Sequence, residues 1–263
     1  METMNTMQKE LIIRGYSKQT IKSYQFHNNA FLKIIKKSPR QVTRSDIKYY
    51  IQCLIDNGYE RATINLTINA LKFYYKEILN RKFEIKRLRT QKKLLPALSR
   101  NEVQRMFDSA TNIKHKILLK VLYYTGIRLS EARDLKIRDI DFERMQIHIR
   151  CGKGNKDRFV TLNEKLKTEL INFLENSNEN KYLFETTHGK YSMRSIQKIC
   201  QTYAKKVGIS KKVTPHTFRR TFATHLIENK NDVSSVSRIM GHKDVSTTYG
   251  YVDYARINLS VDL

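Results

Sequence analysis

The chain has 263 residues, of which 40% are hydrophobic and 10% aromatic, so it can form one large or two modest domains with a sizeable core. With only 9 glycines, 3 prolines and no low-complexity tract, the composition argues against a disordered chain and favours a mostly helical one. Lysines and arginines number 50 against 25 acidic residues, a formal net charge of +25 that favours a polyanionic partner such as nucleic acid. The alternative is a basic surface that is merely solvated.

The first ninety or so residues predict helices. One helix begins after Ser17, whose hydroxyl can cap it, and its apolar residues recur at helical spacing: Ile21, Tyr24, Phe31, Ile34 and Ile35. A second helix begins after Thr43, with Asp46 three residues further on as in a capping box. A third begins near Arg61 and ends before Asn80.

A stretch dense in lysine and arginine follows over residues 82–98 and contains Pro96. Its basic part predicts an interdomain linker that lies on an acidic ligand. Ser99 and Glu102 then have the spacing of a capping box, so a new domain is expected to begin there. We therefore expect a helical domain over 1–86, a basic linker over 87–98 and a second domain over 99–263.

The second domain is predicted to combine helices with one β-hairpin. A helix ends at Gly126 and another begins near Leu129. Residues 145–162 alternate apolar and polar on both sides of the turn GKGNKD, which is typical of a hairpin. Further helices are expected after Thr214-Pro215, before Gly241 and over 244–255. The predicted fold is therefore mainly α, with a small antiparallel hairpin or sheet in the second of two domains.

The three cysteines, Cys53, Cys151 and Cys200, are odd in number and far apart. No CxxC spacing occurs, so neither a zinc knuckle nor a disulfide framework is indicated, and a reduced, cytoplasmic compartment fits. No apolar run approaches the ~18–20 residues that cross a bilayer, and charges interrupt the apolar residues of the N-terminus as they would not in a signal peptide. We expect no membrane association.

Two basic side chains stand where a phosphate can bind. Arg128 lies just after a glycine at the start of a helix, and helix N-termini gather anions that arginine can bind through two hydrogen bonds. Lys153 lies in the hairpin turn between two glycines, which let backbone approach a ligand closely, although no P-loop motif is present. Lys156 and Arg158 share this turn and compete for any role. Taken singly, an exposed surface arginine and a solvated turn lysine are the simpler interpretations.

His216 and Arg219 are three residues apart at the start of a helix and so share one face, and Arg220 is also within reach. His225 is nine residues from His216, half a turn out of phase, so the two histidines point apart. No carboxylate has metal-ligand spacing beside His216. The pattern therefore favours a phosphate over a metal, and we expect neither a metal nor a cofactor.

The C-terminal region carries a histidine and three tyrosines. His242 follows Gly241 directly, and a histidine near a helix C-terminus is stabilised there when charged. Tyr251 and Tyr254 share a helix face, whereas Tyr249 faces the other way and is expected to pack against the protein. Spacing on a helix leaves Tyr251 and Tyr254 open as functional groups.

In this order, the motifs TGIRLSE, GKGNKDR, HTFRRTFATHL and GHKDVSTTYGY resemble the tyrosine recombinase (phage integrase) family, most of all its short Xer-type members. The resemblance covers the whole chain, and residues 1–86 resemble the family's helical, SAM-like core-binding domain, though less specifically. It implies six catalytic residues: Arg128, Lys153, His216, Arg219, His242 and Tyr251. One departure is Gly250, directly before the implied nucleophile, because glycine costs up to ~1 kcal/mol inside a helix.

The resemblance also implies an activity and its partners. Such an enzyme cleaves and rejoins double-stranded DNA at a recombination site through a 3′-phosphotyrosyl intermediate, without metal or ATP. Four protomers act on two sites, as a homo-tetramer or with a paralogue. The compact chain favours Xer-like dimer resolution, with integration or excision of a mobile element left open. Predicted DNA contacts are Arg61, Thr63, Asn65, Lys72, Lys156 and Arg158, and for the first four a solvated helix face is an equal alternative.

Two other classes of protein remain open at this point. A non-catalytic DNA-binding regulator that kept the fold has no need of the tyrosine, so the full set of catalytic residues argues against it. A type IB topoisomerase-like enzyme uses similar chemistry, and the two-domain size and the interval between His242 and Tyr251 argue against that.

Overall fold

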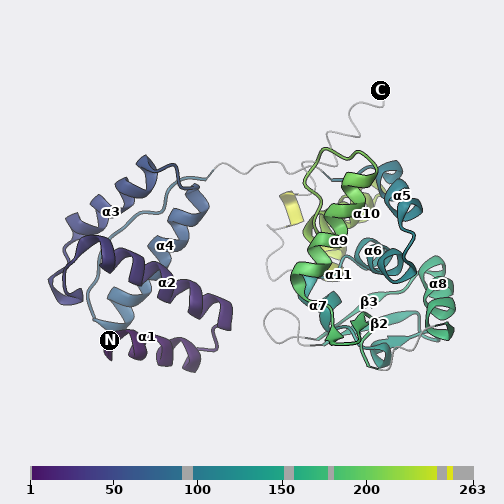
Figure 1. The fold of residues 1–263 in the computed structure, drawn as a ribbon, viewed down its shortest axis with the longest axis horizontal. Coiled ribbons are helices and arrows are strands. Elements are labelled where there is room, and N and C mark those ends of the chain that lie inside the picture. The colour runs from purple at the N-terminus through teal and green to yellow at the C-terminus, as the bar shows by residue number, and fades with distance from the viewer. Residues whose placement is uncertain (1, 91–96, 151–156, 177–180, 242–247, 251–263) are drawn as a thin grey trace. The chain divides into compact units, whose positions relative to one another are not determined.

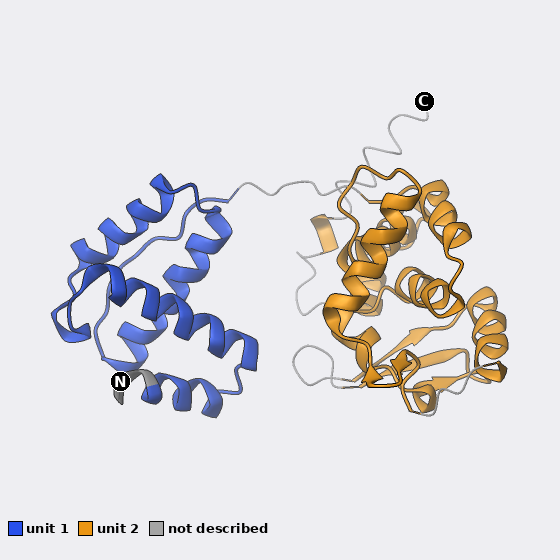
Figure 2. Ribbon diagram, viewed as in Figure 1, with its two compact units in different colours: residues 1–93 blue, residues 94–263 orange. Residues whose placement is uncertain are grey.

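The computed structural model describes residues 2–90, 97–150, 157–176, 181–241 and 248–250. The chain divides into two units, unit 1 (Met1–Lys93) and unit 2 (Leu94–Leu263), shown in Figures 1 and 2. Each unit has a hydrophobic core of its own. None of the described helices is both long and apolar enough to span a bilayer.

Unit 1 is helical. Its elements are α1 (Glu2–Ile13), α2 (Lys18–Ile35), the 3₁₀ turn η1 (Pro39–Gln41), α3 (Arg44–Asp56), α4 (Arg61–Phe73) and the π-helical turn η2 (Tyr74–Ile78) that continues α4. Helices α2 and α4 pack against each other. The core between the helices is aromatic as well as aliphatic, with Phe31 edge-on to both Tyr50 and Tyr75.

Unit 2 is mostly helical, with a small sheet at one end of it (Figure 1). Its helices are α5 (Arg100–Ser109), α6 (Ile113–Thr125), α7 (Leu129–Asp134), η3 (Ile137–Asp139), α8 (Glu164–Glu175), α9 (Met193–Lys206), α10 (Pro215–Glu228) and α11 (Val233–Met240). Helix α6 lies within the unit, in contact with α10 on one side and α8 on another. Leu118, Leu119 and Leu122 of α6 are fully buried, so this helix is the centre of the core.

The strands found in the described part of unit 2 form two antiparallel sheets. The larger joins β1 (Ile140–Asp141), β2 (Gln146–Ile149) and β3 (Arg158–Thr161) in that order, and the smaller joins β4 (Glu185–Thr186) and β5 (Gly189–Lys190). In the register of β2 with β3, Ile147 pairs with Val160 and both are buried, while Phe159 points outward. The predicted hairpin and the mainly α fold with small antiparallel sheets are confirmed.

Four helix starts lie where capping chemistry predicts them. The hydroxyl of Ser17 accepts the N–H of Thr20 at 3.1 Å. The other three starts carry reciprocal capping boxes, in which the first side chain and the one three residues on each bind the other's backbone N–H: Thr43 with Asp46, Ser99 with Glu102, and Thr214 with Thr217. Each box removes two unpaired backbone donors from a helix end, which fixes where the helix begins.

Candidate active site

Two arginines from different helices bind the C-terminal end of α11. Arg219, on α10, donates from Nη2 to the carbonyl of Met240, and Arg128, which precedes α7, donates from Nη2 to the carbonyl of Gly241 at 2.7 Å. A helix C-terminus carries partial negative charge and unpaired carbonyls, so it attracts cations. The fold thus brings together two guanidiniums that are 91 positions apart in the sequence (219 − 128).

Arg219 is almost enclosed, with 3% of its surface exposed. Its Nη1 donates to the carbonyl of Gly126 at 2.6 Å, at the end of α6. An arginine is charged at every physiological pH, and burial of a charge is costly unless hydrogen bonds satisfy it. Arg219 is therefore a fixed cation that ties the ends of α6 and α11 together.

His216 lies one helical turn before Arg219 and is exposed. Partial enclosure of its ring by protein lowers its pKa, and the positive charges of Arg220, Arg219 and Arg128 lower it further. Because an ordinary histidine has a pKa near 6.5, this ring is neutral at pH 7. A neutral imidazole can accept a proton, so His216 is suited to act as a general base beside two cations.

A carboxylate that was not predicted as a site residue links Arg128 to Arg158. Glu131 has only 4% of its side chain exposed, and it binds the guanidiniums of both Arg128 and Arg158. Burial alone would raise the pKa of Glu131, but hydrogen bonds and charge from Arg158 and Arg128 lower it to about 2. Glu131 lies three residues after Arg128 at a helix start, and its carboxylate accepts the backbone N–H of Arg128 at 2.7 Å. This capping-box spacing was the one feature of the sequence that could have pointed to a contact between Glu131 and Arg128.

Replacing Glu131 by glutamine is expected to change how the stability of unit 2 depends on pH. A folded pKa of about 2 against an ordinary 4.5 means that Glu131 contributes stability that is present above pH 4.5 and lost as pH falls toward 2. The contribution is on the order of 3 kcal/mol. In Glu131→Gln, unfolding followed by hydrogen exchange in unit 2 should show a lower stability at pH 7 and a shallower acid limb. Glu143→Gln, at an exposed glutamate, is the control. Parallel pH curves for wild type and Glu131→Gln would contradict the prediction.

Gly126 shapes the site by its backbone. It ends α6 in the left-handed conformation, with φ +59°, as predicted for a glycine after a helix. A Cβ at this position would lie 2.3 Å from Cδ1 of Phe222, and the carbonyl of Gly126 accepts a hydrogen bond from Arg219. The absence of a side chain thus allows α6 and α10 to approach closely where Arg219 is held.

Gly126→Ala is expected to destabilise unit 2 by roughly 2–5 kcal/mol, the sum of left-handed strain and overpacking against Phe222. The matched control is Gly208→Ala, because Gly208 has φ +71° but no atom of a described residue lies within 4 Å of the added Cβ. Only the strain of roughly 1–2 kcal/mol applies there. Denaturant unfolding of both variants measures the difference. Equal losses in the free energy of unfolding would show that overpacking against Phe222 does not contribute to the destabilisation.

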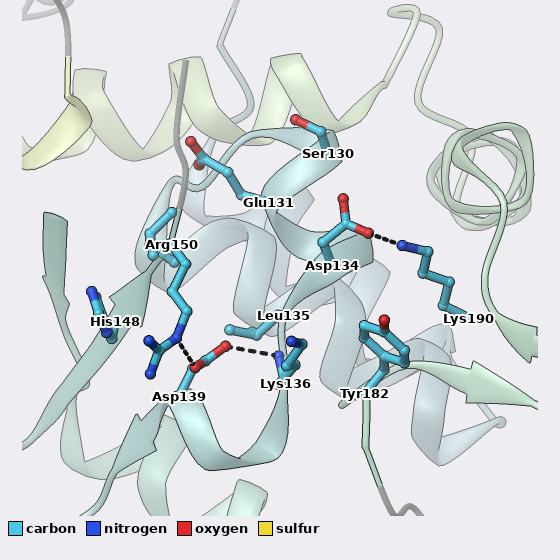
Figure 3. A pocket seen from close by; sticks show the side chains of 11 residues that line it. Ser130, Glu131, Asp134, Leu135, Lys136, Asp139, His148, Arg150, Tyr182 and Lys190 are labelled. Carbon is cyan, nitrogen blue, oxygen red and sulfur yellow. Dashed lines mark hydrogen bonds and ion pairs between the residues drawn. The ribbon is translucent and has the colours of Figure 1, made fainter. Parts of the chain in front are cut away.

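A cavity of about 330 Å³ lies beside α7, and Figure 3 shows the side chains that line it. Its acidic side chains are paired. Asp134 binds Lys190, and Asp139 accepts from Nε of Arg150 at 2.6 Å and from the backbone N–H of Lys136 at 3.3 Å. Glu131 lies at its edge, but neither Arg128 nor Arg219 lines it. Among the described residues, no group of three or more histidines, cysteines or carboxylates is placed to hold a metal ion.

Comparison with known proteins identifies the chain. Residues 96–256 match the model of the phage integrase family, and residues 4–85 match the N-terminal SAM-like domain of phage integrases. The chain belongs to the phage integrase family of tyrosine recombinases. The recombinase is 34% identical to tyrosine recombinase XerA of Pyrococcus horikoshii over 92% of its own length and 85% of that protein. It is 30% identical to tyrosine recombinase XerD of Oceanobacillus iheyensis, over 94% of its own length and 92% of that protein.

Solved structures agree with the fold. A crystal structure of XerA recombinase is 30% identical, with a TM-score of 0.59 over 99% of the recombinase and 97% of that chain. A lambda integrase dimer bound to a COC′ core site has a TM-score of 0.78 at 17% identity, over 96% of the recombinase and 95% of that chain. XerH bound to a palindromic difH substrate has a TM-score of 0.76 at 22% identity, over 95% of the recombinase and 80% of that chain. The last two likenesses concern the fold alone.

Some predicted site residues of the recombinase lie outside the described residues. These are Lys153, Lys156, His242 and Tyr251. The helix predicted over 244–255 also lies mostly outside, although residues 248–250 are helical. Tyr249 was expected to pack, and that expectation is wrong, because its side chain is 56% exposed while its neighbour Thr248 is the buried one.

The predicted DNA contacts of unit 1 lie on α4, and two of them bind the chain that follows. The side chain of Asn65 is 5% exposed and exchanges two hydrogen bonds with the backbone of Leu88, at 2.8 and 3.0 Å. Arg61 is exposed and donates to the carbonyl of Arg89 at 3.0 Å. Thr63 and Lys72 are half-buried. Leu88 and Arg89 belong to the predicted linker, so its first residues are attached to unit 1.

Arg158, the remaining predicted contact, lies at the start of β3 and points into unit 2, with 12% of its side chain exposed. The other histidine of α10, His225, is 7% exposed, and its Nδ1 lies 2.9 Å from the hydroxyl of Tyr123. It is a core histidine on a different face from His216. The two arginines and the histidine implied by the family motifs, Arg128, Arg219 and His216, are therefore the ones that converge.

Proposed function

We propose that the recombinase performs site-specific DNA recombination, cleaving a strand with Tyr251 and rejoining it to a partner strand through a 3′-phosphotyrosyl intermediate. The observation that carries the proposal is the convergence of Arg128 and Arg219 on adjacent carbonyls beside a neutral His216. A phosphodiester is the ligand that suits two fixed guanidiniums with a proton acceptor next to them.

The arginines supply charge where the reaction develops it. Attack on a phosphodiester adds negative charge to the nonbridging oxygens in a pentacoordinate transition state. Guanidiniums that are already fixed by protein carbonyls stabilise that charge without reorganising. In the proposed mechanism His242 donates a further hydrogen bond to the same oxygens.

Proton transfers complete the mechanism. A tyrosine hydroxyl has a pKa near ~10 and is a poor nucleophile at neutral pH, so a base must take its proton. His216 serves as that base, since its lowered pKa leaves it neutral. Lys153 gives a proton to the leaving 5′ oxygen. The phosphotyrosyl bond retains the energy of the phosphodiester, so rejoining requires neither ATP nor a metal.

The assembly and the biological role are part of the proposal. Residues 1–86 bind the core site, 87–98 form a basic linker and 99–263 carry the chemistry, so that the two domains clamp DNA. Four protomers, identical or with a paralogue, exchange strands between two sites. The relatives named tyrosine recombinase XerA and XerD support an Xer-like role in resolving dimers, with integration or excision as the second candidate.

A suicide-substrate assay tests the chemistry. The protein is incubated in EDTA, without ATP, with nicked fragments from its own replicon, each labelled either upstream of the cleaved bond or downstream of it, between that bond and the nick. We expect a covalent adduct on a denaturing gel that retains only the label upstream of the cleaved bond, because the protein holds the 3′ phosphate. A two-site substrate should then give recombinant product.

Other outcomes correspond to other functions. Salt-sensitive binding without any adduct across the replicon would indicate a DNA-binding regulator. An adduct with relaxation of supercoils but no recombinant from two sites would indicate a topoisomerase-like enzyme. An adduct on the downstream label would exclude a 3′-phosphotyrosyl intermediate.

A further inference from the structure

Arg158 is an arginine turned inward at the base of the hairpin. It is the first residue of β3 and pairs with Ile149, the last residue of β2. Only 12% of its side chain is exposed, and its Nε is buried without a hydrogen-bond partner among the described residues. A residue that serves to neutralise a DNA phosphate needs an accessible guanidinium, so its orientation requires another explanation.

The guanidinium of Arg158 binds Glu131 in a bidentate pair, from Nη1 to Oε1 at 2.8 Å and from Nη2 to Oε2 at 2.7 Å. The same two oxygens hold Arg128. Oε1 accepts from its Nη1 at 2.8 Å, and Oε2 accepts from its backbone N–H at 2.7 Å. One carboxylate therefore accepts three hydrogen bonds from the two guanidiniums and a fourth from the backbone of Arg128, and bidentate arginine pairs are the most geometrically specific of such contacts.

Arg158 also lies against the second group that holds Arg128. Gly241 has φ +61°, and a Cβ there would lie 2.8 Å from Cδ of Arg158. The carbonyl of Gly241 accepts the Nη2 of Arg128. Arg158 thus flanks both acceptors of the Arg128 guanidinium, and it packs on the glycine that directly precedes His242 in the sequence.

The charges explain why a second arginine is useful. If Glu131 were paired with Arg128 alone, the two charges would cancel, and the site would have one cation fewer for a phosphate. With Arg158 added, two positive charges share one negative charge, so a net positive charge remains on the group. Electrostatic interactions are strong in such a buried setting, which makes this difference matter for the transition state.

We propose that Arg158 is a positioning residue that fixes Arg128 through Glu131 and Gly241 and preserves its charge for the scissile phosphate. The proposal rests on the proposed function, since Arg128 is taken as a catalytic cation. It assigns Arg158 a role within the protein in place of the predicted contact with DNA.

The test separates the rate of adduct formation at saturating DNA from the affinity for DNA. In Arg158→Met we expect the adduct rate to fall about 10- to 100-fold, as for other losses of positioning. DNA affinity should stay within about 2-fold, with an unchanged slope of affinity against salt. Arg158→Lys keeps the charge but loses the bidentate pair, so its adduct rate should lie between those of wild type and Arg158→Met. Arg144→Met removes an exposed arginine beside β2 and is the matched control, expected to leave the adduct rate unchanged.

Two further measurements keep the outcome decisive. Guanidinium NMR signals of Arg128, assigned by their loss in Arg128→Lys, should be protected in wild type and exchange rapidly in Arg158→Met, whether or not any adduct forms. If wild type gives no adduct but these signals behave as expected, the proposed function fails and the structural role of Arg158 stands. In the double variant with Glu131→Gln, the loss of rate should not exceed that of the worse single variant, because the residues act as a unit.

The opposite results overturn the proposal. A phosphate contact would lower affinity and reduce the salt slope by about 1 in Arg158→Met, with a normal adduct rate at saturation. Unchanged Arg128 signals, or losses of rate that add in the double variant, would show that Arg158 does not act through Glu131.

Discussion

Tyr251→Phe is expected to reduce the covalent adduct to background while leaving DNA binding unchanged. The substitution removes only the phenolic oxygen, which in the proposed mechanism attacks the phosphorus, and it keeps the aromatic ring. A denaturing gel of the upstream-labelled suicide substrate measures the adduct, and an electrophoretic mobility shift measures binding. No other residue can replace the missing nucleophile without a change of geometry, so the loss should be complete rather than graded.

The neighbouring tyrosines provide the controls for Tyr251. Tyr249 is 56% exposed and lies two positions earlier, on a different face of a helix. Tyr254 is three positions later and shares a face with Tyr251, which makes it the more demanding control. Both Tyr249→Phe and Tyr254→Phe should form adduct at close to the wild-type rate. An adduct that survives in Tyr251→Phe and disappears in Tyr254→Phe would move the nucleophile to Tyr254.

Much of the fold was predictable because it depends on local chemistry. The starts of α2, α3, α5 and α10 are set by hydroxyl caps whose partners lie three residues away. The ends of α6 and α11 are set by the left-handed conformation of Gly126 and Gly241. The helices α1, α8 and α9 were not assigned from the sequence. Local signals were present for them as well, because Gly15 and Gly208 follow α1 and α9 in the left-handed conformation. The side chains of Asn163 and Ser192 cap the starts of α8 and α9.

The residues of the site were predictable from the sequence, but the hydrogen bonds that hold them in place were not. Motif order identifies Arg128, His216 and Arg219. It does not identify what holds them, because backbone carbonyls carry no signature in a sequence. The roles of Asn65 and Arg158 depend on partners 23 and 27 residues away, whereas the sequence alone predicts both as DNA contacts. Their burial, visible only in the fold, is what changes the interpretation.

Arg219→Met is expected to have two separable effects, one on catalysis and one on stability. Loss of a fixed cation next to the scissile phosphate should lower the adduct rate by about 10²- to 10³-fold. Loss of the donors to the carbonyls of Gly126 and Met240 should destabilise unit 2 by roughly 2–6 kcal/mol, since each buried acceptor left unpaired costs about 1–3 kcal/mol. Adduct formation well below the unfolding transition, together with denaturant unfolding, measures the two effects.

Arg219→Lys and Arg220→Met decide whether position 219 itself is responsible. An ammonium on a single stem cannot reach two carbonyls on different helices as the planar guanidinium does, so Arg219→Lys should recover little of either loss. Arg220 is the adjacent residue on α10 and was within reach of the same face by spacing alone, but it is less buried than Arg219. Its methionine variant should keep more activity and most of the stability. If Arg220→Met abolished the adduct and Arg219→Met did not, the buried arginine would be a structural cross-link between α6 and α11, and the catalytic cation would have to be assigned to Arg220.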